Sequence, residues 1–321
     1  MGVRRMKKVV VFGGGTGLSC LLSGLKLFPV DVTTVITVSD NGSSTGVLKK
    51  ELDIPAVGDV GKVLISMANV DEDFTRLLRY RFSKDGSLHN HPVRNVMLAA
   101  LIDLKGNLTE ATRYMCRLLN VKGTVLPLTE ERVELVGETD KGRKAFYGQV
   151  AVSRNIRSIS RLSYDHDVHV TQEVVSHIRE SDLIIFSPGS LYTSILPHLI
   201  APAVVEAIAA SSAPILYVCN LVTQPGETDD YKVSDHLRVI NDYLRGRRVD
   251  VVLVNNGPLP ADVLDVYHST EDKSAVTLDR EAVEALGASI IEDAVAVTEE
   301  GQLRHDALRT AFLIFSYLMR T

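Results

Sequence analysis

The chain has 321 residues, of which 45% are hydrophobic and 23% charged, and this is the composition of an ordinary globular protein. Its formal net charge of −5 argues against a general nucleic-acid binder, because such proteins need a basic surface. The three cysteines, Cys20, Cys116 and Cys219, are too few and too scattered for a disulfide framework or a zinc site. No apolar run approaches the ~18 residues of a membrane span, so we expect a cytoplasmic protein.

Short apolar segments alternate with helical ones along most of the chain. The first, residues 9–12, is wholly apolar and ends in glycines, which is typical of a strand buried on both faces. A helix with leucines at helical spacing is predicted at 18–28. Further strands are predicted at 32–38, 183–186, 215–219 and 251–254, and further helices at 203–210 and 233–244. This alternation predicts an α/β fold with a doubly wound, mostly parallel sheet and helices on both faces.

One region departs from this alternation. Helices are predicted at 95–104 and 108–119, the second preceded by Asn107 as an N-cap. Short antiparallel strands are then predicted at 124–128, 133–137 and 149–152, and the chain ends in an amphipathic helix at 305–319. We therefore expect a single α/β domain over 1–321, with an inserted cap or subdomain of helices and a small antiparallel sheet at about 70–160.

Polar or glycine-rich loops follow five of the predicted strands. In a right-handed βαβ sheet all five meet at one edge, and ligands of open parallel sheets bind outside the carboxyl ends of the strands. We therefore predict a binding crevice at that edge. The loops are residues 13–17, 39–46, 187–190, 220–228 and 255–258.

Two of these loops are candidate anion cradles. In residues 13–17 (GGGTG) glycines let backbone N–H groups approach an anion at the start of a helix. In residues 187–190 (SPGS) the last serine can cap the next helix. The first loop is not a Walker A motif, since Leu18 rather than lysine follows Gly17, and it lacks the third glycine of the dinucleotide pattern. Two cradles suit a diphosphate, while plain strand–helix turns remain the alternative.

Acidic residues stand in two of the loops. Asp40, at the end of the second strand, could bond a ribose hydroxyl or hold Mg²⁺ against a diphosphate, and Asp-Asn-Gly also suits a simple Asx-turn. Glu227 or Asp229 could serve as a metal ligand or base, or belong to a solvated acidic loop. No Ser-His-Asp or Cys-His set can be assembled from the spacing, so the catalytic residues stay unknown.

Together the loops resemble a known family. The likeness runs in order over nearly the whole chain, through Arg304-His305-Asp306, and rests on residues 13–17, 39–46, 55–59, 187–194 and 219–228. These segments are similar to the gluconeogenesis factor family (YvcK type), which is related to the 2-phospho-L-lactate transferases (CofD type).

The resemblance implies a Rossmann-like fold and a cytoplasmic regulator needed for growth on gluconeogenic carbon sources and for normal cell shape and wall synthesis. The implied ligand is a nucleotide sugar of the UDP-N-acetylglucosamine type, and no reaction is firmly implied. As partners we expect the nucleotide sugar, a further copy of the chain and a protein target, but no nucleic acid and no membrane span.

The resemblance also assigns ligand contacts by matching position. Four residues of the first loop would face the diphosphate, namely Gly14, Gly15, Thr16 and Gly17. The second cradle would be Ser187, Gly189 and Ser190. Asp40 and Asn41 would face ribose or a metal, and Asn220 and Thr223 the base or sugar. Tyr267 would stack on a base, and Arg304 would pair with phosphate.

Two departures from the family pattern leave alternatives open. Asn41 stands where the CofD branch has a second acid. Arg94 replaces a glycine of the family pattern before the insertion helix. The Arg94 side chain either fills space meant for the ligand or adds a contact to phosphate. The alternatives to a regulator are a CofD-like, metal-dependent transferase that moves a phospholactyl group from a nucleotide diphosphate donor, and an NAD-binding protein or oxidoreductase.

Overall fold

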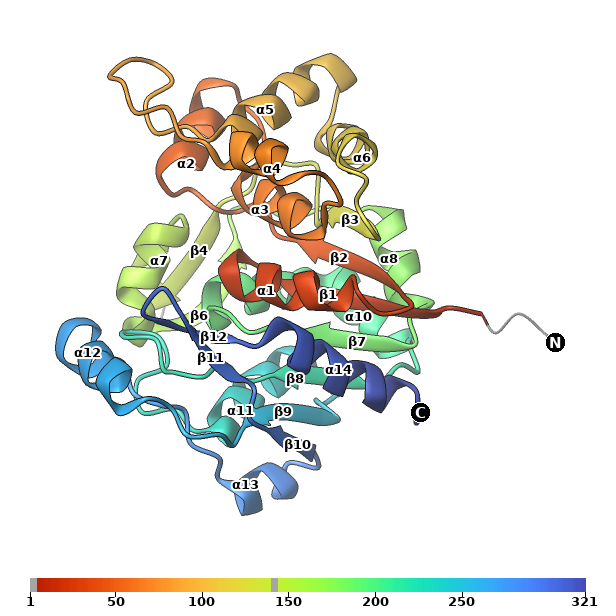
Figure 1. The fold of residues 1–321 in the computed structure, drawn as a ribbon, viewed down its shortest axis with the longest axis vertical. Coiled ribbons are helices and arrows are strands. Elements are labelled where there is room, and N and C mark those ends of the chain that lie inside the picture. The colour runs from red at the N-terminus through yellow and green to blue at the C-terminus, as the bar shows by residue number, and fades with distance from the viewer. Residues whose placement is uncertain (1–4, 140–143) are drawn as a thin grey trace.

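Seven parallel strands form the central sheet, as the prediction of a doubly wound parallel sheet requires. The structure, a computed structural model, describes residues 5–139 and 144–321. The strand order is β10-β9-β8-β7-β1-β2-β3 (Figure 1). The bounds are β1 (Lys7–Gly13), β2 (Val30–Ile36), β3 (Thr124–Pro127), β7 (Leu183–Phe186), β8 (Ile215–Val218), β9 (Val251–Asn255) and β10 (Ser289–Asp293).

Helices cover both faces of this sheet because its strands are apolar on both sides. In β1, Val9 and Val11 belong to one buried cluster, and Val10 and Phe12 belong to the other. The first cluster is shared with α1 (Gly15–Leu25), α3 (Gly58–Met67) and α14 (Ala307–Leu318). The second is shared with α8 (Gln172–Arg179), α9 (Leu196–Leu199), α10 (Pro202–Ala210), α11 (Val233–Tyr243) and α13 (Arg280–Ala285). The result is a three-layer α/β/α arrangement.

Further helices extend the face that carries α1. They are α2 (Ser43–Glu51), α4 (Glu72–Arg79), α5 (Val93–Lys105) and α6 (Leu108–Leu118) (Figure 1). Asn107 caps α6 as predicted, since its Oδ1 accepts a hydrogen bond from the Glu110 N–H at 2.8 Å. The remaining helix of the C-terminal part is α12 (Ala261–Glu271).

Two small antiparallel sheets complete the fold. One has the order β5-β4-β6 and the other pairs β11 with β12. Their bounds are β4 (Leu135–Thr139), β5 (Ala145–Tyr147), β6 (Ile159–Tyr164), β11 (Ala296–Glu299) and β12 (Gln302–His305).

Two strand predictions in this region are wrong. The segment expected at 124–128 is no part of the antiparallel group, because β3 pairs in parallel with β2 and joins the main sheet. The strand expected at 149–152 is the helix α7 (Gln149–Asn155), which is followed by the short turn η2 (Ile156–Ser158). The β-branched Val150 and Val152 favoured a strand, but the chain turns at Gly148, where φ is +84°, and Val152 packs into the core as a helical residue.

Within residues 5–139 and 144–321, no single helix is long and apolar enough to cross a membrane. The bent pair Leu191–Leu199 and Pro202–Ala210 meets the requirement only when both helices are taken together.

Candidate functional site

The candidate site is a cleft at the point where the chain changes direction across the sheet. From β1 the chain proceeds to β2 and β3 on one side, and it returns to β7 on the other side of β1. Ligands of such sheets bind at this switch point, outside the carboxyl ends of the strands. A cavity of about 390 Å³ lies there, lined by Gly14, Gly15, Thr16, Gly17, Asp40, Asp59, Lys62, Gln149, Ser153, Gly189, Ser190, Thr193, Ser194 and Gln224.

Backbone groups of the glycine loop form one wall. Helix α1 begins at Gly15 without a side-chain cap, so no capping side chain takes the N–H groups of its first turn. At Gly17 the helix runs against the loop after β7. An added Cβ there would lie 2.8 Å from the Pro188 carbonyl carbon and closer still to its oxygen. Glycine is therefore required for the two loops to meet at backbone level.

The loop after β7 forms the opposite wall. Ser190 caps the single π-helical turn η3 (Leu191–Ile195), since its Oγ accepts a hydrogen bond from the Thr193 N–H at 3.0 Å. Both ends of the Asn220 amide are bonded to Gly189: Oδ1 accepts from its N–H at 2.8 Å, and Nδ2 donates to its carbonyl at 2.9 Å. Asn220 therefore holds the second cradle in place.

A buried carboxyl lies behind this cradle. Glu227 is 5% exposed and accepts hydrogen bonds from the Ser190 hydroxyl at 2.8 Å and from the Tyr192 N–H at 2.9 Å. Burial raises the pKa of Glu227 to about 6, and the bonds from Tyr192 and Ser190 oppose that rise. Glu227 orients Ser190 and does not line the cleft. Because its carboxyl is buried, Glu227 is not part of a solvated acidic loop.

Replacing Glu227 with glutamine is expected to stabilise the protein at neutral pH. Because the pKa of the folded state, about 6, lies above the ordinary 4.5, the folded state binds the proton more tightly. Stability from this group is then greatest below about pH 4.5 and is lost as pH rises through 6. The difference corresponds to about 2 kcal/mol. Urea unfolding at pH 5 and pH 7.5 measures the part of this difference that falls in that range, about 1 kcal/mol.

The matched control for that measurement is Glu206→Gln on α10, an exposed carboxyl. The control should show the same pH dependence as the parent protein, whereas Glu227→Gln should show less. Equal pH dependence in all three proteins would mean that Glu227 titrates normally.

Two carboxylates and one lysine form the third wall. Asp40 makes the predicted Asx-turn, with Oδ1 accepting from the Gly42 N–H at 2.8 Å, and it also lines the cleft. Burial raises the pKa of Asp40, and the nearby charge of Asp59 raises it further. Asp59 is bonded to Lys62 at 2.8 Å one turn along α3. A cation in the cleft would relieve the repulsion between the two acids.

Asp40 and Asp59 together have the chemistry of a partial Mg²⁺ site. Mg²⁺ is commonly held by one or two carboxylates together with phosphate oxygens of the ligand. Asp40 and Asp59 fit that pattern. In the described part of the chain no group of three or more His, Cys, Asp and Glu side chains could hold a metal ion, so the ligand would have to complete the coordination.

Several residues assigned by resemblance lie away from the cavity lining and have partners of their own. The Asn41 Oδ1 accepts from the Val150 N–H at 3.1 Å and so fastens α7. Ser187 is fully buried, and Thr223 Oγ1 accepts from the Ser274 N–H at 2.9 Å. The Tyr267 hydroxyl accepts from the Leu303 N–H at 3.0 Å in a small buried cluster, and Arg304 bonds to Gln302. The aliphatic part of the Arg94 side chain packs against Gly61, and Arg94 is 7% exposed.

The cleft also includes residues that were not predicted as ligand contacts. Asp59 and Lys62 come from α3, Gln149 and Ser153 from α7, and Gln224 from the loop after β8. One signal existed for Asp59, which ends the family-like segment 55–59. No such signal existed for Gln149 or Ser153, because their segment was taken for a strand.

Comparisons with known proteins show the family and the fold of the chain. The family model of the 2-phospho-L-lactate transferase CofD matches residues 9–296. A gluconeogenesis factor of Halalkalibacterium halodurans is 39% identical over 99% of this chain and 98% of its own length, and one of Bacillus subtilis is 38% identical over 97% and 98%. A crystal structure of a Bacillus halodurans protein superposes with a TM-score of 0.92 at 39% identity, covering 97% of this chain and 100% of that one.

Proposed function

Since the chain belongs to the gluconeogenesis factor family, within the wider CofD family, we propose that its cleft binds a nucleotide diphosphate sugar of the UDP-N-acetylglucosamine type. The protein would act in the cytoplasm as a regulator that supports growth on gluconeogenic carbon sources and normal cell shape. The ligand class follows from the family resemblance, and the features of the cleft support the diphosphate part of it.

The observation that carries the proposal is the meeting of two backbone walls. The uncapped start of α1 and the loop before η3 face one cavity at the switch point between β1 and β7. A helix N-terminus offers N–H groups and a positive dipole end to an anion. Among the described residues that line this cavity, Lys62 is the one basic residue, and it adds a formal positive charge.

A divalent cation is part of the proposal. Asp40 and Asp59 lie on the same cavity as the glycine loop, so Mg²⁺ bound to them would also reach diphosphate oxygens. The ion would neutralise both the ligand and the two acids, and it would relieve the charge repulsion from Asp59 that, after burial, raises the pKa of Asp40.

The acid pair also favours a second candidate function, phospho-group transfer of the CofD type with a divalent metal. Transfer needs an acceptor hydroxyl that attacks the phosphorus of the phospholactyl group, a group that takes its proton, and a nucleoside monophosphate that leaves as the diphosphate bond breaks. Asp40 is the acid of the cleft whose pKa is raised toward that role, whereas Glu227 lies behind Ser190. A third candidate function is NAD binding, with Asp40 at the usual position of the ribose-binding acid.

Isothermal titration separates these functions. The ligands are UDP-N-acetylglucosamine, UDP-glucose, NAD and GDP, each with and without Mg²⁺, and the recovered ligand is analysed by ³¹P NMR. We expect tight binding of the UDP-sugars and intact ligand afterwards. Conversion of the sugar nucleotide would exclude a pure sensor, and metal-dependent preference for GDP would favour the transferase.

A further inference from the structure

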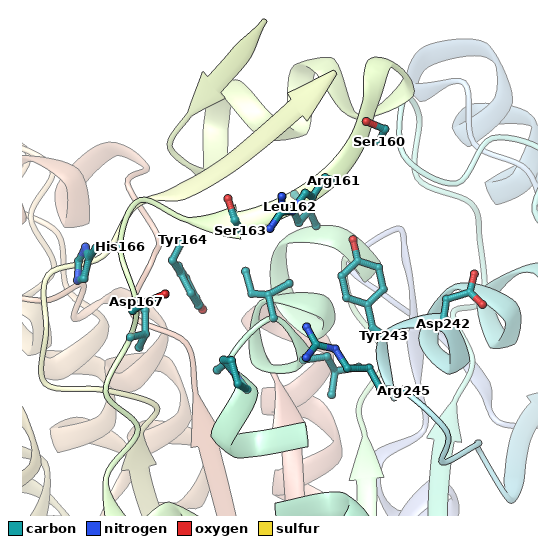
Figure 2. A pocket seen from close by; sticks show the side chains of 15 residues that line it. Ser160, Arg161, Leu162, Ser163, Tyr164, His166, Asp167, Asp242, Tyr243 and Arg245 are labelled. Carbon is teal, nitrogen blue, oxygen red and sulfur yellow. The ribbon is translucent and has the colours of Figure 1, made fainter. Parts of the chain in front are cut away.

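A second cavity lies away from the cleft and shares none of its lining residues. It has a volume of about 540 Å³ and is formed by β6, the turn between α9 and α10, and the C-terminal end of α11 (Figure 2). The cleft lies instead at the carboxyl ends of β1 and β7. Its size suits a small metabolite, since ligand sites commonly measure 300–1,000 Å³.

Two arginines approach this cavity from opposite walls. Arg161 extends from β6 and Arg245 from the end of α11, and the ring of Tyr243 stands beside both (Figure 2). Within the described part of the chain, neither arginine forms an ion pair. The Asp242 side chain also lines the cavity, and in this view the Tyr243 ring lies between it and the two guanidinium groups (Figure 2). The two guanidinium groups are therefore available to an anion.

The backbone at Arg245 is held in a conformation that favours glycine. Its φ is +50°, and Gly246 follows with φ +115°. The position after a helix normally takes glycine when the chain turns this way. A long charged residue there is costly, and residues in such conformations cluster at ligand sites. Here the turn directs the Arg245 side chain into the cavity (Figure 2).

A helix N-terminus reaches the same cavity. Helix α10 starts at Pro202 after Ala201, both of which line the cavity, and no side chain caps it. Its positive dipole end therefore adds to the field of the two arginines. At the other end of the cavity, the side chains of Ser163 and Asp167 have no hydrogen-bond partner among the described residues, and they can bond sugar hydroxyls.

We propose that this cavity is an effector site for a small phosphorylated metabolite of monosaccharide size. Its phosphate lies between Arg161, Arg245 and the start of α10, and its hydroxyls face Ser163 and Asp167. Bidentate arginine recognition is the arrangement that phosphate groups favour.

The effector site is connected to the cleft by continuous structure. The segment formed by η3 and α9 lines the cleft at Thr193 and Ser194, and it ends at Leu199 on the second cavity. The Tyr164 hydroxyl donates to the Pro197 carbonyl at 2.8 Å and so ties β6 to α9. A π-helical turn such as η3 is a common feature of functional segments. Occupancy of one site should therefore change affinity at the other.

The direct test is isothermal titration of the whole protein, in phosphate-free buffer, with inorganic phosphate, glucose 6-phosphate and glucose. Glucose 6-phosphate should bind at one saturable site and glucose should not. Arg161→Gln and Arg245→Gln should each weaken that binding by about tenfold or more. The matched control is Arg248→Gln, an exposed arginine outside the cavity, which should stay within about twofold of the parent.

Absence of saturable binding by glucose 6-phosphate and phosphate would overturn the proposal, as would equal weakening by the Arg248 control. This arm does not depend on the nucleotide ligand. A second titration, of UDP-N-acetylglucosamine with and without glucose 6-phosphate, should show an affinity change of about fivefold or more in the parent protein and none in Arg245→Gln. Phosphate binding without that change would refute the coupling between the sites.

Discussion

Replacing Gly17 with alanine should lower the free energy of unfolding by about 3 kcal/mol, which is near the upper end of the usual cost of adding atoms to a well-packed site. The new Cβ would lie 2.8 Å from a backbone carbon of Pro188, and the protein cannot relieve that contact by rotating a side chain. Either α1 or the loop before η3 has to move. The same displacement separates the two walls of the cleft, so nucleotide-sugar binding should fall with it. Urea unfolding followed by isothermal titration measures both effects.

Ser19→Ala is the matched control for this change, because it lies one half-turn further along α1. There the substitution removes one hydrogen bond from the Ser19 hydroxyl to the Gly15 carbonyl and adds no atoms. We expect a loss of about 1 kcal/mol or less. If Gly17→Ala is as stable as the control, the two loops do not meet as closely as described, and the glycine requirement fails.

Replacing Lys62 with alanine should weaken nucleotide-sugar binding by about tenfold or more, the usual value of a charge-assisted hydrogen bond to phosphate. Stability should fall by about 1 kcal/mol or less, since the Lys62 side chain is 41% exposed, although that of its i,i+3 partner Asp59 is only 12% exposed. Lys62→Arg should retain most of the affinity because it keeps the charge. Calorimetric affinity and melting temperature, measured on each variant, separate binding from folding.

Arg304→Ala decides whether Lys62 or Arg304 supplies the positive charge that binds the phosphate of the ligand. The resemblance assigns Arg304 to phosphate, but the side chain lies on β12, bonded to Gln302 and outside the cavity lining. We expect its removal to leave the affinity unchanged. A loss in Arg304→Ala together with normal binding by Lys62→Ala would reverse this assignment and place the phosphate elsewhere.

The sheet could be predicted from the sequence because its strands are buried on both faces. Residues such as those of 9–12 and 183–186 are wholly apolar, which few structures other than a central parallel strand allow. The right-handed crossover rule then placed their polar loops at one edge, and the cleft is found there. Residues 149–152 could not be predicted in the same way, because their two valines favour a strand, whereas the turn at Gly148 and the packing of Val152 produce a helix.

The candidate site was predictable only in part, for a different reason. Backbone cradles depend on local sequence, and the glycines of 13–17 and the serine at 190 are recognisable without a structure. A polar side chain in a loop, by contrast, can either face a ligand or hold the loop together. Asn220 and Thr223 do the second, since their polar groups are bonded to Gly189 and Ser274.

By itself, then, the sequence determined the parallel α/β architecture, the edge that carries the cleft and the glycine-lined part of its wall. These features follow from burial and from backbone chemistry, both of which are local. The tertiary structure decided which charged groups share a cavity: Lys62 and the acids Asp40 and Asp59 in the cleft, and Arg161 and Arg245 in the second cavity. Each group combines side chains from segments far apart in the chain, and only packing brings such segments together.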